Sequence, residues 1–176
     1  MFLNTIIFSP FLNMTRHQRK NAISNTQVGI HFEGLVYEFF KYQFPSLKRP
    51  FWIPIGHIEK KEHKFDLGCS EQKVIIECKS HTWTEGGNVP SAKITTWDQA
   101  MLYFFLAPRG YRKIFAVKHD ASPKSGETLC SYYLRTHSHL IPDEVEFWEI
   151  DEEANKFNKI DFDLTNRFKG ISAGRK

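Results

Sequence analysis

The chain has 176 residues, a net charge of +4 and a pI of about 8.9. This length favours one domain, and the mild positive charge permits a polyanionic partner without requiring one. The three cysteines form no Cys-x-x-Cys pair, which argues against a disulfide framework or a cysteine-rich zinc site and favours a reducing cytoplasm. No apolar run reaches the ~18–20 residues that cross a bilayer, so we expect no membrane-spanning segment.

The amino-terminal segment is the part of the chain that raises the question of a signal peptide. Residues 1–12 are apolar, but they lack a positively charged start, and Pro10 interrupts them. The basic residues follow this apolar part rather than preceding it. We expect residues 1–24 to form an arm packed on the domain, or an extension ahead of a start at Met14, and the sequence leaves both open.

The first predicted element is an amphipathic helix over residues 26–44. Its apolar side follows the i, i+3, i+4, i+7 spacing of a helix that covers a core. Asn25 or Thr26 could cap its start, and Pro45 ends it, because a proline disfavours helical backbone in the residue before it. The residues on this side are Phe32, Leu35, Val36, Phe39, Phe40 and Gln43.

Short apolar runs joined by polar turns follow this helix. Residues 51–55 predict an edge strand, because Pro54 lacks the N–H that a central strand needs. Residues 63–69 and 74–79 predict a hairpin whose second arm begins with the β-branched apolar residues typical of a buried strand. Residues 80–93 are rich in Gly, Pro and Ser, so they predict a loop that leaves this arm and is well placed to touch a substrate.

The second half of the chain alternates helices and strands. We predict a helix over residues 95–106, a buried strand over 112–118, a helix over 128–140 and a strand over 145–150. The first of these helices has one apolar face that should pack on a sheet. That face consists of Trp97, Ala100, Met101, Phe104 and Phe105.

This order of elements predicts the fold class. One helix, three strands and then alternating helices and strands indicate an α/β sandwich, with helices flanking a mixed central sheet. We assign this core to residues 25–150. Residues 151–176 alternate charged and aromatic side chains without a clear period, so we expect a carboxy-terminal tail that packs on the core or trails from it.

Two carboxylates and one lysine lie at the ends of the predicted hairpin arms. Asp66 lies within the first arm, and Glu77 and Lys79 end the second. Side chains alternate along a strand, so Glu77 and Lys79 share a face while Cys78 points the other way as a small buried apolar residue. Carboxylates supply hard oxygen ligands for Mg²⁺, and the lysine can position a water or stabilise developing charge.

This arrangement resembles the PD-(D/E)xK nuclease superfamily, whose fold is that of many restriction endonucleases. Asp66 matches the first acid of that motif, and Glu77 and Lys79 match its E-x-K, whereas Phe65 stands where the family usually has a proline. The resemblance implies a restriction-endonuclease-like core and a Mg²⁺ site, in which Mn²⁺ would substitute. Asp66, Glu77 and the main-chain carbonyl of Cys78 would be the metal ligands.

Two neighbouring helices extend the resemblance. Members of the superfamily often carry a helical glutamate ahead of the hairpin that reaches the metal through water, and Glu33 fits that position; the alternative is a solvated helix glutamate. Gln99 and Tyr103 are four residues apart and share one side of a helix. They resemble the Q-x-x-x-Y of the RecB-type branch, in which both residues approach the active site or the DNA backbone; the alternative is a half-exposed pair on a core helix.

The expected function is that of a Mg²⁺-dependent DNA endonuclease, such as a type II restriction enzyme. A repair or junction nuclease is the first alternative, a subunit that cuts only within a larger complex the second, and a non-cleaving nucleic-acid-binding module the third. The expected partner is double-stranded DNA. Cutting both strands with one site per chain favours a homodimer or a partner subunit.

Overall fold

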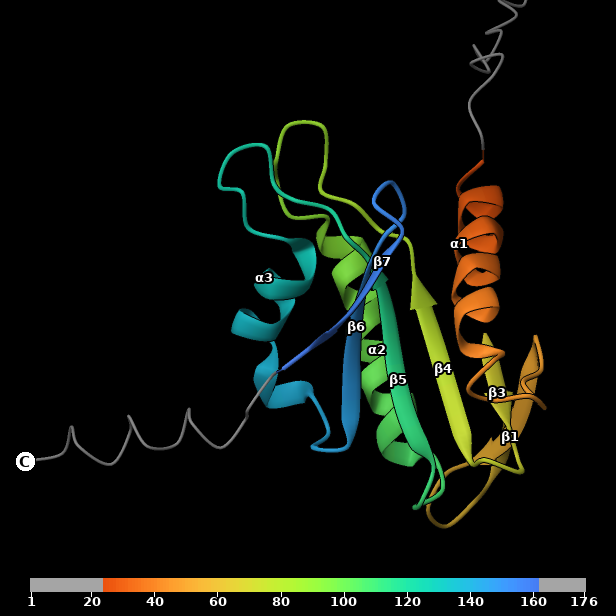
Figure 1. The fold of residues 1–176 in the computed structure, drawn as a ribbon. Helices are drawn as coiled ribbons and strands as arrows, with labels where there is room; N and C mark the ends of the chain where they lie inside the picture. The colour runs from red at the N-terminus through yellow and green to blue at the C-terminus, as the bar shows by residue number, and fades with distance from the viewer. Residues whose placement is uncertain (1–23, 162–176) are drawn as a thin grey trace, which may run out of the picture.

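The computed structural model describes residues 24–161, which form an α/β protein with a mixed five-stranded sheet and three α-helices (Figure 1). The predicted fold class is confirmed at this level. The elements in chain order are α1 (Asn25–Phe40), β1 (Phe51–Ile55), β2 (Lys61–Phe65), β3 (Leu67–Cys69), β4 (Val74–Lys79), α2 (Ser91–Leu106), β5 (Arg112–Lys118), α3 (Leu129–Thr136), the short 3₁₀ helix η1 (Ser138–Leu140), β6 (Val145–Asp151) and β7 (Lys156–Ile160). The predicted amino-terminal arm lies outside the described residues. Within them, no helix is long and apolar enough to cross a membrane.

The five-stranded sheet has the order β3-β4-β5-β6-β7. Strands β4, β5 and β6 run parallel, and the two outer strands run antiparallel to their neighbours. Parallel strands end at the same edge, so the residues that follow β4, β5 and β6 gather at one end of the molecule (Figure 1). This is the end at which ligands of open α/β sheets characteristically bind.

The predicted hairpin is confirmed, with one refinement. Its second arm is β4, but its first arm divides at Asp66 into β2 and β3. Strand β3 pairs with β4, whereas β2 pairs with β1 in a separate two-stranded sheet. Asp66 therefore occupies the point at which the chain passes from one sheet to the other.

Helices cover both faces of the five-stranded sheet. The α1 side packs on Val74, Ile76 and Cys78, and the α2 and α3 side packs on Ile75. This alternation along β4 follows from the period of two in a strand and confirms that Cys78 points into an apolar core. The three cysteines are free and buried.

Helix α1 starts at a capping box in which Ser24 and Gln27 each accept a hydrogen bond from the other's main-chain N–H, both at 3.2 Å. It ends at Phe40, four residues earlier than we predicted. The chain still turns after Phe40, because the N–H of Phe44 donates to its carbonyl at 2.8 Å, and this turn places Phe44 in the core before Pro45.

Helix α2 begins earlier than predicted, at Ser91, and buries the predicted apolar residues except Phe105. Phe105 is 59% exposed, so its assignment to the sheet-facing side was wrong. Near the carboxy-terminal end of α2, this ring contacts His57 beyond β1, with ring centroids 5.3 Å apart, rather than the sheet.

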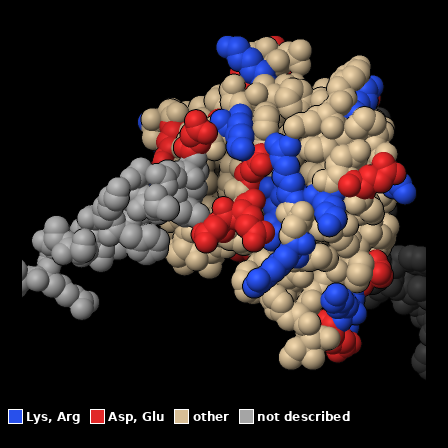
Figure 2. Space-filling model, turned by 60° about the horizontal axis from the view of Figure 1, so that its bottom comes forward, with Lys and Arg blue, Asp and Glu red and all other residues tan. Residues whose placement is uncertain are grey.

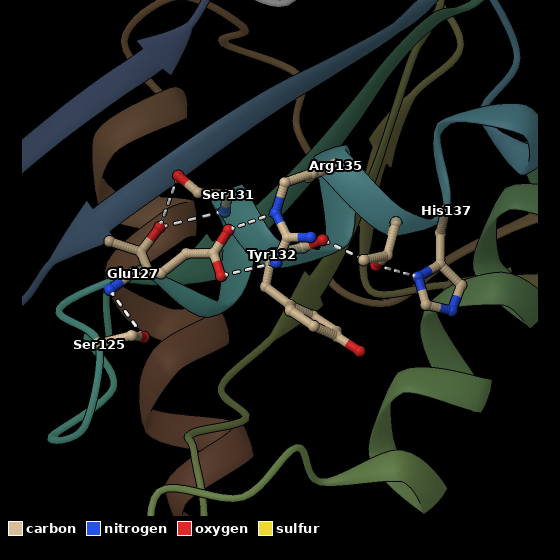
Figure 3. A network of polar contacts seen from close by, with 8 residues as sticks. Ser125, Glu127, Ser131, Tyr132, Arg135 and His137 are labelled. Carbon is tan, nitrogen blue, oxygen red and sulfur yellow. Dashed lines mark hydrogen bonds and ion pairs between the residues drawn. The ribbon is translucent and has the colours of Figure 1, made fainter.

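Helix α3 is shorter than predicted. Thr128 caps it by accepting a hydrogen bond from the N–H of Ser131 at 3.1 Å (Figure 3). The predicted helix over residues 128–140 stops at Thr136, whose hydroxyl bonds the carbonyl of Tyr132 at 2.7 Å. His137 leaves helical geometry, and η1 follows. A hydroxyl that bonds a carbonyl in the preceding turn competes with helix continuation.

Strand β7 lies in the carboxy-terminal segment for which we predicted no regular structure. It pairs with β6, and the ring of Phe157 stacks on Phe39 of α1 with 4.0 Å between centroids. Its residues are only partly buried or exposed, so they lack the apolar alternation that predicts a strand. The sheet therefore extends beyond residue 150, to Ile160.

The other end of the sheet, where β5 and β6 begin, carries paired charges (Figure 2). Arg112 makes two hydrogen bonds to Glu146, at 2.8 and 2.9 Å, and Lys113 pairs with Glu144 at 2.5 Å. The Arg112 and Lys159 pairs lower the pKa of Glu146 to about 2 against the opposing effect of burial. Glu144 and Glu146 thus each have a basic partner at this end.

Candidate active site

The division between β2 and β3 positions Asp66. Leu67 pairs with Ile76, so Asp66 lies beside Glu77 at the carboxyl end of β4. The N–H of Cys78 donates to Oδ2 of Asp66 at 2.8 Å. This hydrogen bond holds the carboxylate against the strand and leaves its other oxygen, Oδ1, without a partner in the described part of the chain.

Glu77 and Lys79 share a face of β4, as the alternation of a strand predicts. Nζ of Lys79 donates to Oε1 of Glu77 at 2.7 Å. The two side chains are only 13% and 17% exposed, so the ion pair is largely removed from water. The structure therefore brings Asp66, Glu77 and Lys79 together in one cluster.

Burial dominates the electrostatics of this cluster. It raises the pKa of Glu77 to about 7, and the nearby Asp66 adds to this rise, against the opposing effect of Lys79. Burial likewise raises the pKa of Asp66, although the Cys78 N–H and Lys79 counteract it. Burial alone would lower the pKa of Lys79, but the charge and hydrogen bond of Glu77 raise it. The two acids thus repel each other, and a cation beside them would lower their free energy.

Glu33 of α1 approaches the same cluster from a different element. Burial raises its pKa, and the charge of Asp66 adds to that rise. Its carboxylate pairs with Nε of Arg49 at 3.3 Å, and Nη2 of Arg49 donates to the carbonyl of Ile30 at 2.6 Å. Arg49 therefore fixes Glu33 at the rim of the cluster, a role that no sequence pattern indicates, because the residue lies in an irregular segment.

The acids fit a magnesium ion that keeps most of its water. Within residues 24–161, no three His, Cys, Asp or Glu side chains are arranged to hold one ion together. Asp66 and Glu77 each have one carboxylate oxygen without a hydrogen-bond partner among these residues, so two carboxylates are available. Mg²⁺ is commonly held by one or two carboxylates with water in the remaining positions. Glu33, already paired with Arg49, suits a contact through such a water.

A cavity of about 450 Å³ borders the cluster. Glu33, Asp66 and Lys79 line it, and so do Trp83 and Lys93. Glu77 reaches it through Lys79 rather than lining it. Trp83 and Lys93 both belong to the segment 80–93 that the sequence indicated as a substrate-contacting loop, but Lys93 lies in the first turn of α2 instead.

This loop is held in place by the neighbouring loop between β5 and α3, and the two lie side by side in Figure 1. The N–H of Trp83 donates to Oδ2 of Asp120 at 2.6 Å, and Nζ of Lys124 donates to Oδ1 of Asn88 at 2.9 Å. The Trp83 ring also meets Tyr132 edge-on, with centroids 5.4 Å apart. The cavity wall is therefore built before any ligand arrives.

The structure places Gln99 and Tyr103 away from this cavity lining. Gln99 is exposed and borders a separate hollow together with Thr95 and Leu102. Tyr103 is partly buried and packs against His63, with ring centroids 3.9 Å apart. The charge of Asp66 reaches His63, so Tyr103 is one residue removed from the cluster. The role that the resemblance implies for this pair stays a prediction.

No protein-family model, curated protein or solved structure matches this chain.

Proposed function

We propose that this protein is a Mg²⁺-dependent nuclease that hydrolyses phosphodiester bonds of DNA. The observation that carries this proposal is the convergence of Asp66, Glu77 and Lys79 at the carboxyl end of β4, where burial raises the pKa of both acids and the charge of Asp66 raises that of Glu77 further. Perturbed titratable groups that line a cavity are typical of catalytic sites. A sheet with helices on both faces is compatible with the proposed restriction-endonuclease-like core.

Each residue of the cluster has a distinct part in the proposed reaction. Asp66 and Glu77 would hold the metal, with the main-chain carbonyl of Cys78 as a further ligand. A bound Mg²⁺ polarises the scissile phosphate and lowers the pKa of a coordinated water. Lys79, a cation on the cavity lining, orients the attacking water and stabilises negative charge that develops on the phosphate. Glu33 orients water in the outer shell.

The substrate assignment rests on the cavity and on the sign of its groups. Acids alone would repel a phosphate backbone, but Lys79 and Lys93 line the same cavity and offset that repulsion. The described residues contain one such cluster, so cutting both strands of a duplex favours two copies related by symmetry. We accordingly propose a homodimer on double-stranded DNA.

A cleavage assay tests this proposal. Purified protein is incubated with plasmid and linear DNA in Mg²⁺, in Mn²⁺ and in EDTA, beside the Asp66→Ala and Glu77→Ala variants. We expect cleavage that requires the metal and falls at least ~10²-fold in each variant, the scale of losing one preorganised electrostatic element. The exposed Glu38→Ala serves as the matched acid control on α1. Undiminished cleavage by either variant of the cluster would refute the assignment.

The isolated chain could instead be a subunit that cuts only within a complex, or a module that binds nucleic acid without cleaving it. Calorimetric titration with Mn²⁺ separates these outcomes. Metal binding by the wild type that Asp66→Ala abolishes, without cleavage, would favour the subunit. DNA binding without any metal binding would favour the module, and would contradict the proposed metal site.

A further inference from the structure

His81 lies at the candidate site, where one of its ring nitrogens accepts a hydrogen bond and the other is available to a ligand. The indole N–H of Trp97 donates to Nδ1 of His81 at 2.9 Å. An indole nitrogen can only donate, so Nδ1 must be the unprotonated acceptor, and a neutral imidazole then carries its proton on Nε2. Trp97 belongs to α2 and is fully buried in the core, so its indole holds the His81 ring in one position.

The free nitrogen of His81 can meet a ligand. His81 lines the cavity that Asp66 and Lys79 border. Nε2 of His81 is not one of the fully buried, unpartnered polar atoms of the described residues. Burial, with Lys79 and Lys93 nearby, lowers the pKa of His81 to about 4. At neutral pH the ring is therefore an uncharged donor with one tautomer.

Lys93 is a second donor on the same cavity. Lys93 lies in the first turn of α2, where the partial positive charge of a helix amino terminus adds to its own. Trp83 lines the cavity as well, and its indole nitrogen is buried without a partner among the described residues. His81 and Lys93 lie close enough for the lysine charge to lower the pKa of the imidazole. A neutral N–H donor beside an ammonium is an arrangement that binds an anion, and these two donors share the cavity lining with Glu33 and Asp66.

We propose that His81 and Lys93 form a phosphate-binding subsite, in which Nε2–H of His81 and the ammonium of Lys93 donate to non-bridging oxygens of a nucleic-acid phosphate. This subsite rests on the proposed function, because it orients the backbone of the strand that the cluster cuts. Trp97 is a positioning residue that acts by holding the His81 tautomer. A fixed neutral donor suits this role, because it contributes a directional hydrogen bond without adding a further charge beside Lys79.

Histidine-selective ¹⁵N NMR of the full chain in EDTA tests the subsite, with a short double-stranded oligonucleotide as the probe. We expect His81 to show the Nε2–H tautomer at neutral pH and its Nε2 resonance to shift as the oligonucleotide is added. The exposed His139 is the internal control, and its resonance should stay in place. A His81 resonance that is unaffected by saturating oligonucleotide would overturn the proposal.

Variants extend the test to affinity. His81→Ala and Lys93→Gln should each weaken oligonucleotide binding in EDTA by roughly three- to tenfold, the scale of one hydrogen bond to a charged group. His81→Gln, which keeps a donor at the position of Nε2, should recover part of the loss. Lys61→Gln is the matched lysine control, because the Lys61 side chain is exposed on β2 and pairs with Glu59 at 3.9 Å. Equal affinities for Lys93→Gln and Lys61→Gln would contradict the assignment of Lys93.

Trp97→Phe tests the positioning role, since it keeps an aromatic ring but removes the N–H. We expect this variant to populate both His81 tautomers and to raise KM more than it lowers kcat. An unchanged tautomer would overturn the positioning role of Trp97. Should His81→Ala fail to fold, the wild-type titration and His81→Gln still decide the proposal.

The same titration in the Asp66→Ala variant separates this proposal from the proposed function. A His81 shift that persists in this variant would support the subsite independently of cleavage, and if the wild type also fails to cleave DNA in Mg²⁺, the nuclease proposal falls while the subsite stands. Metal-dependent cleavage together with a His81 resonance that does not shift on adding the oligonucleotide would support the nuclease and overturn the subsite.

Discussion

Two ion pairs in this molecule have similar donor–acceptor distances and opposite electrostatics. Lys79 donates to Glu77 at 2.7 Å at the end of β4, and Arg135 donates to Glu127 at 2.8 and 2.9 Å on α3 (Figure 3). The pKa of Glu77 is raised to about 7, mainly by burial, whereas that of Glu127 is lowered, mainly by the hydrogen bond from Arg135. An ion pair therefore does not by itself decide the charge state of its acid: burial outweighs the pair at Glu77, whereas the hydrogen bond from Arg135 prevails at the more exposed Glu127.

The difference between these pairs shows what each one does. Glu127 and Arg135 are 27% and 57% exposed, so water solvates both charges. The pair links the residue before the cap of α3 to the last turn of that helix. Glu77 is buried beside a second acid, Asp66, and one lysine cannot neutralise both. A protein retains such an arrangement at a cost in stability, which is typical of a site that binds a cation or carries out chemistry.

Removing Lys79 should have the largest effect on this comparison. We predict that Lys79→Ala lowers turnover by at least ~10²-fold, because the site loses a preorganised charge aimed at the reacting phosphate. DNA affinity should change little, since one phosphate-side charge contributes only a small part of the total. Single-turnover cleavage and filter binding measure the two effects separately.

Lys79→Arg sharpens this prediction, because it keeps the charge. A planar guanidinium cannot replace a compact ammonium that positions one water, so this variant should also fail in turnover. Arg135→Lys on α3 is the matched exchange at the exposed pair and should cleave normally. Near-normal cleavage by Lys79→Ala would show that Lys79 is only a partner of Glu77.

The sequence predicts well the elements that carry the buried ion pair. The β-branched start of β4 and the i, i+4 pattern of α1 arise from local spacing, so both elements were predicted. Alternation along β4 also predicts that Glu77 and Lys79 share a face, which the hydrogen bond between them confirms. Asp66 was placed beside them by the hairpin, although its position at the division between two sheets was not foreseen.

What the sequence did not predict depends on distant contacts. Strand β7 has few buried residues and exists because β6 offers it an edge. Phe105 continues an apolar helical pattern, but nothing in that pattern indicates where the sheet ends beneath it. The bond from Trp97 to His81 joins residues sixteen positions apart, in a helix and a loop. Such pairs become visible only when the elements are packed.

A smaller effect should appear in stability. Because the pKa of Glu77 is raised from 4.5 to about 7, the folded protein binds more protons than the unfolded chain between these values. Its stabilising contribution is full below about pH 4.5 and is lost as pH rises to about 7. We predict that the metal-free wild type loses roughly 1–3 kcal/mol across this range relative to Glu77→Gln, given about 1.4 kcal/mol per pKa unit.

Urea unfolding in EDTA at several pH values measures this difference. Repeating the series in Mg²⁺ should restore wild-type stability near pH 7, because a bound cation stabilises both carboxylates, and should leave Glu77→Gln less affected. A wild type and a variant with parallel pH profiles would show that Glu77 titrates normally and would remove the contrast with Glu127.

The exposed pair supplies the smallest effect, and it has the opposite sign. The pKa of Glu127 lies below its ordinary value of 4.5, so its contribution to stability is present above that pH and is lost as pH falls through the folded-state pKa. We predict that Glu127→Gln matches the wild type in cleavage and differs slightly in stability only above about pH 4.5. Urea unfolding at low and high salt is the measurement, since screening should shrink this difference much more than it changes the Glu77 profile. A Glu127 difference that resists salt would mean that the network on α3 is shielded from solvent as the buried cluster is, and the two pairs would then differ only in their neighbouring acid.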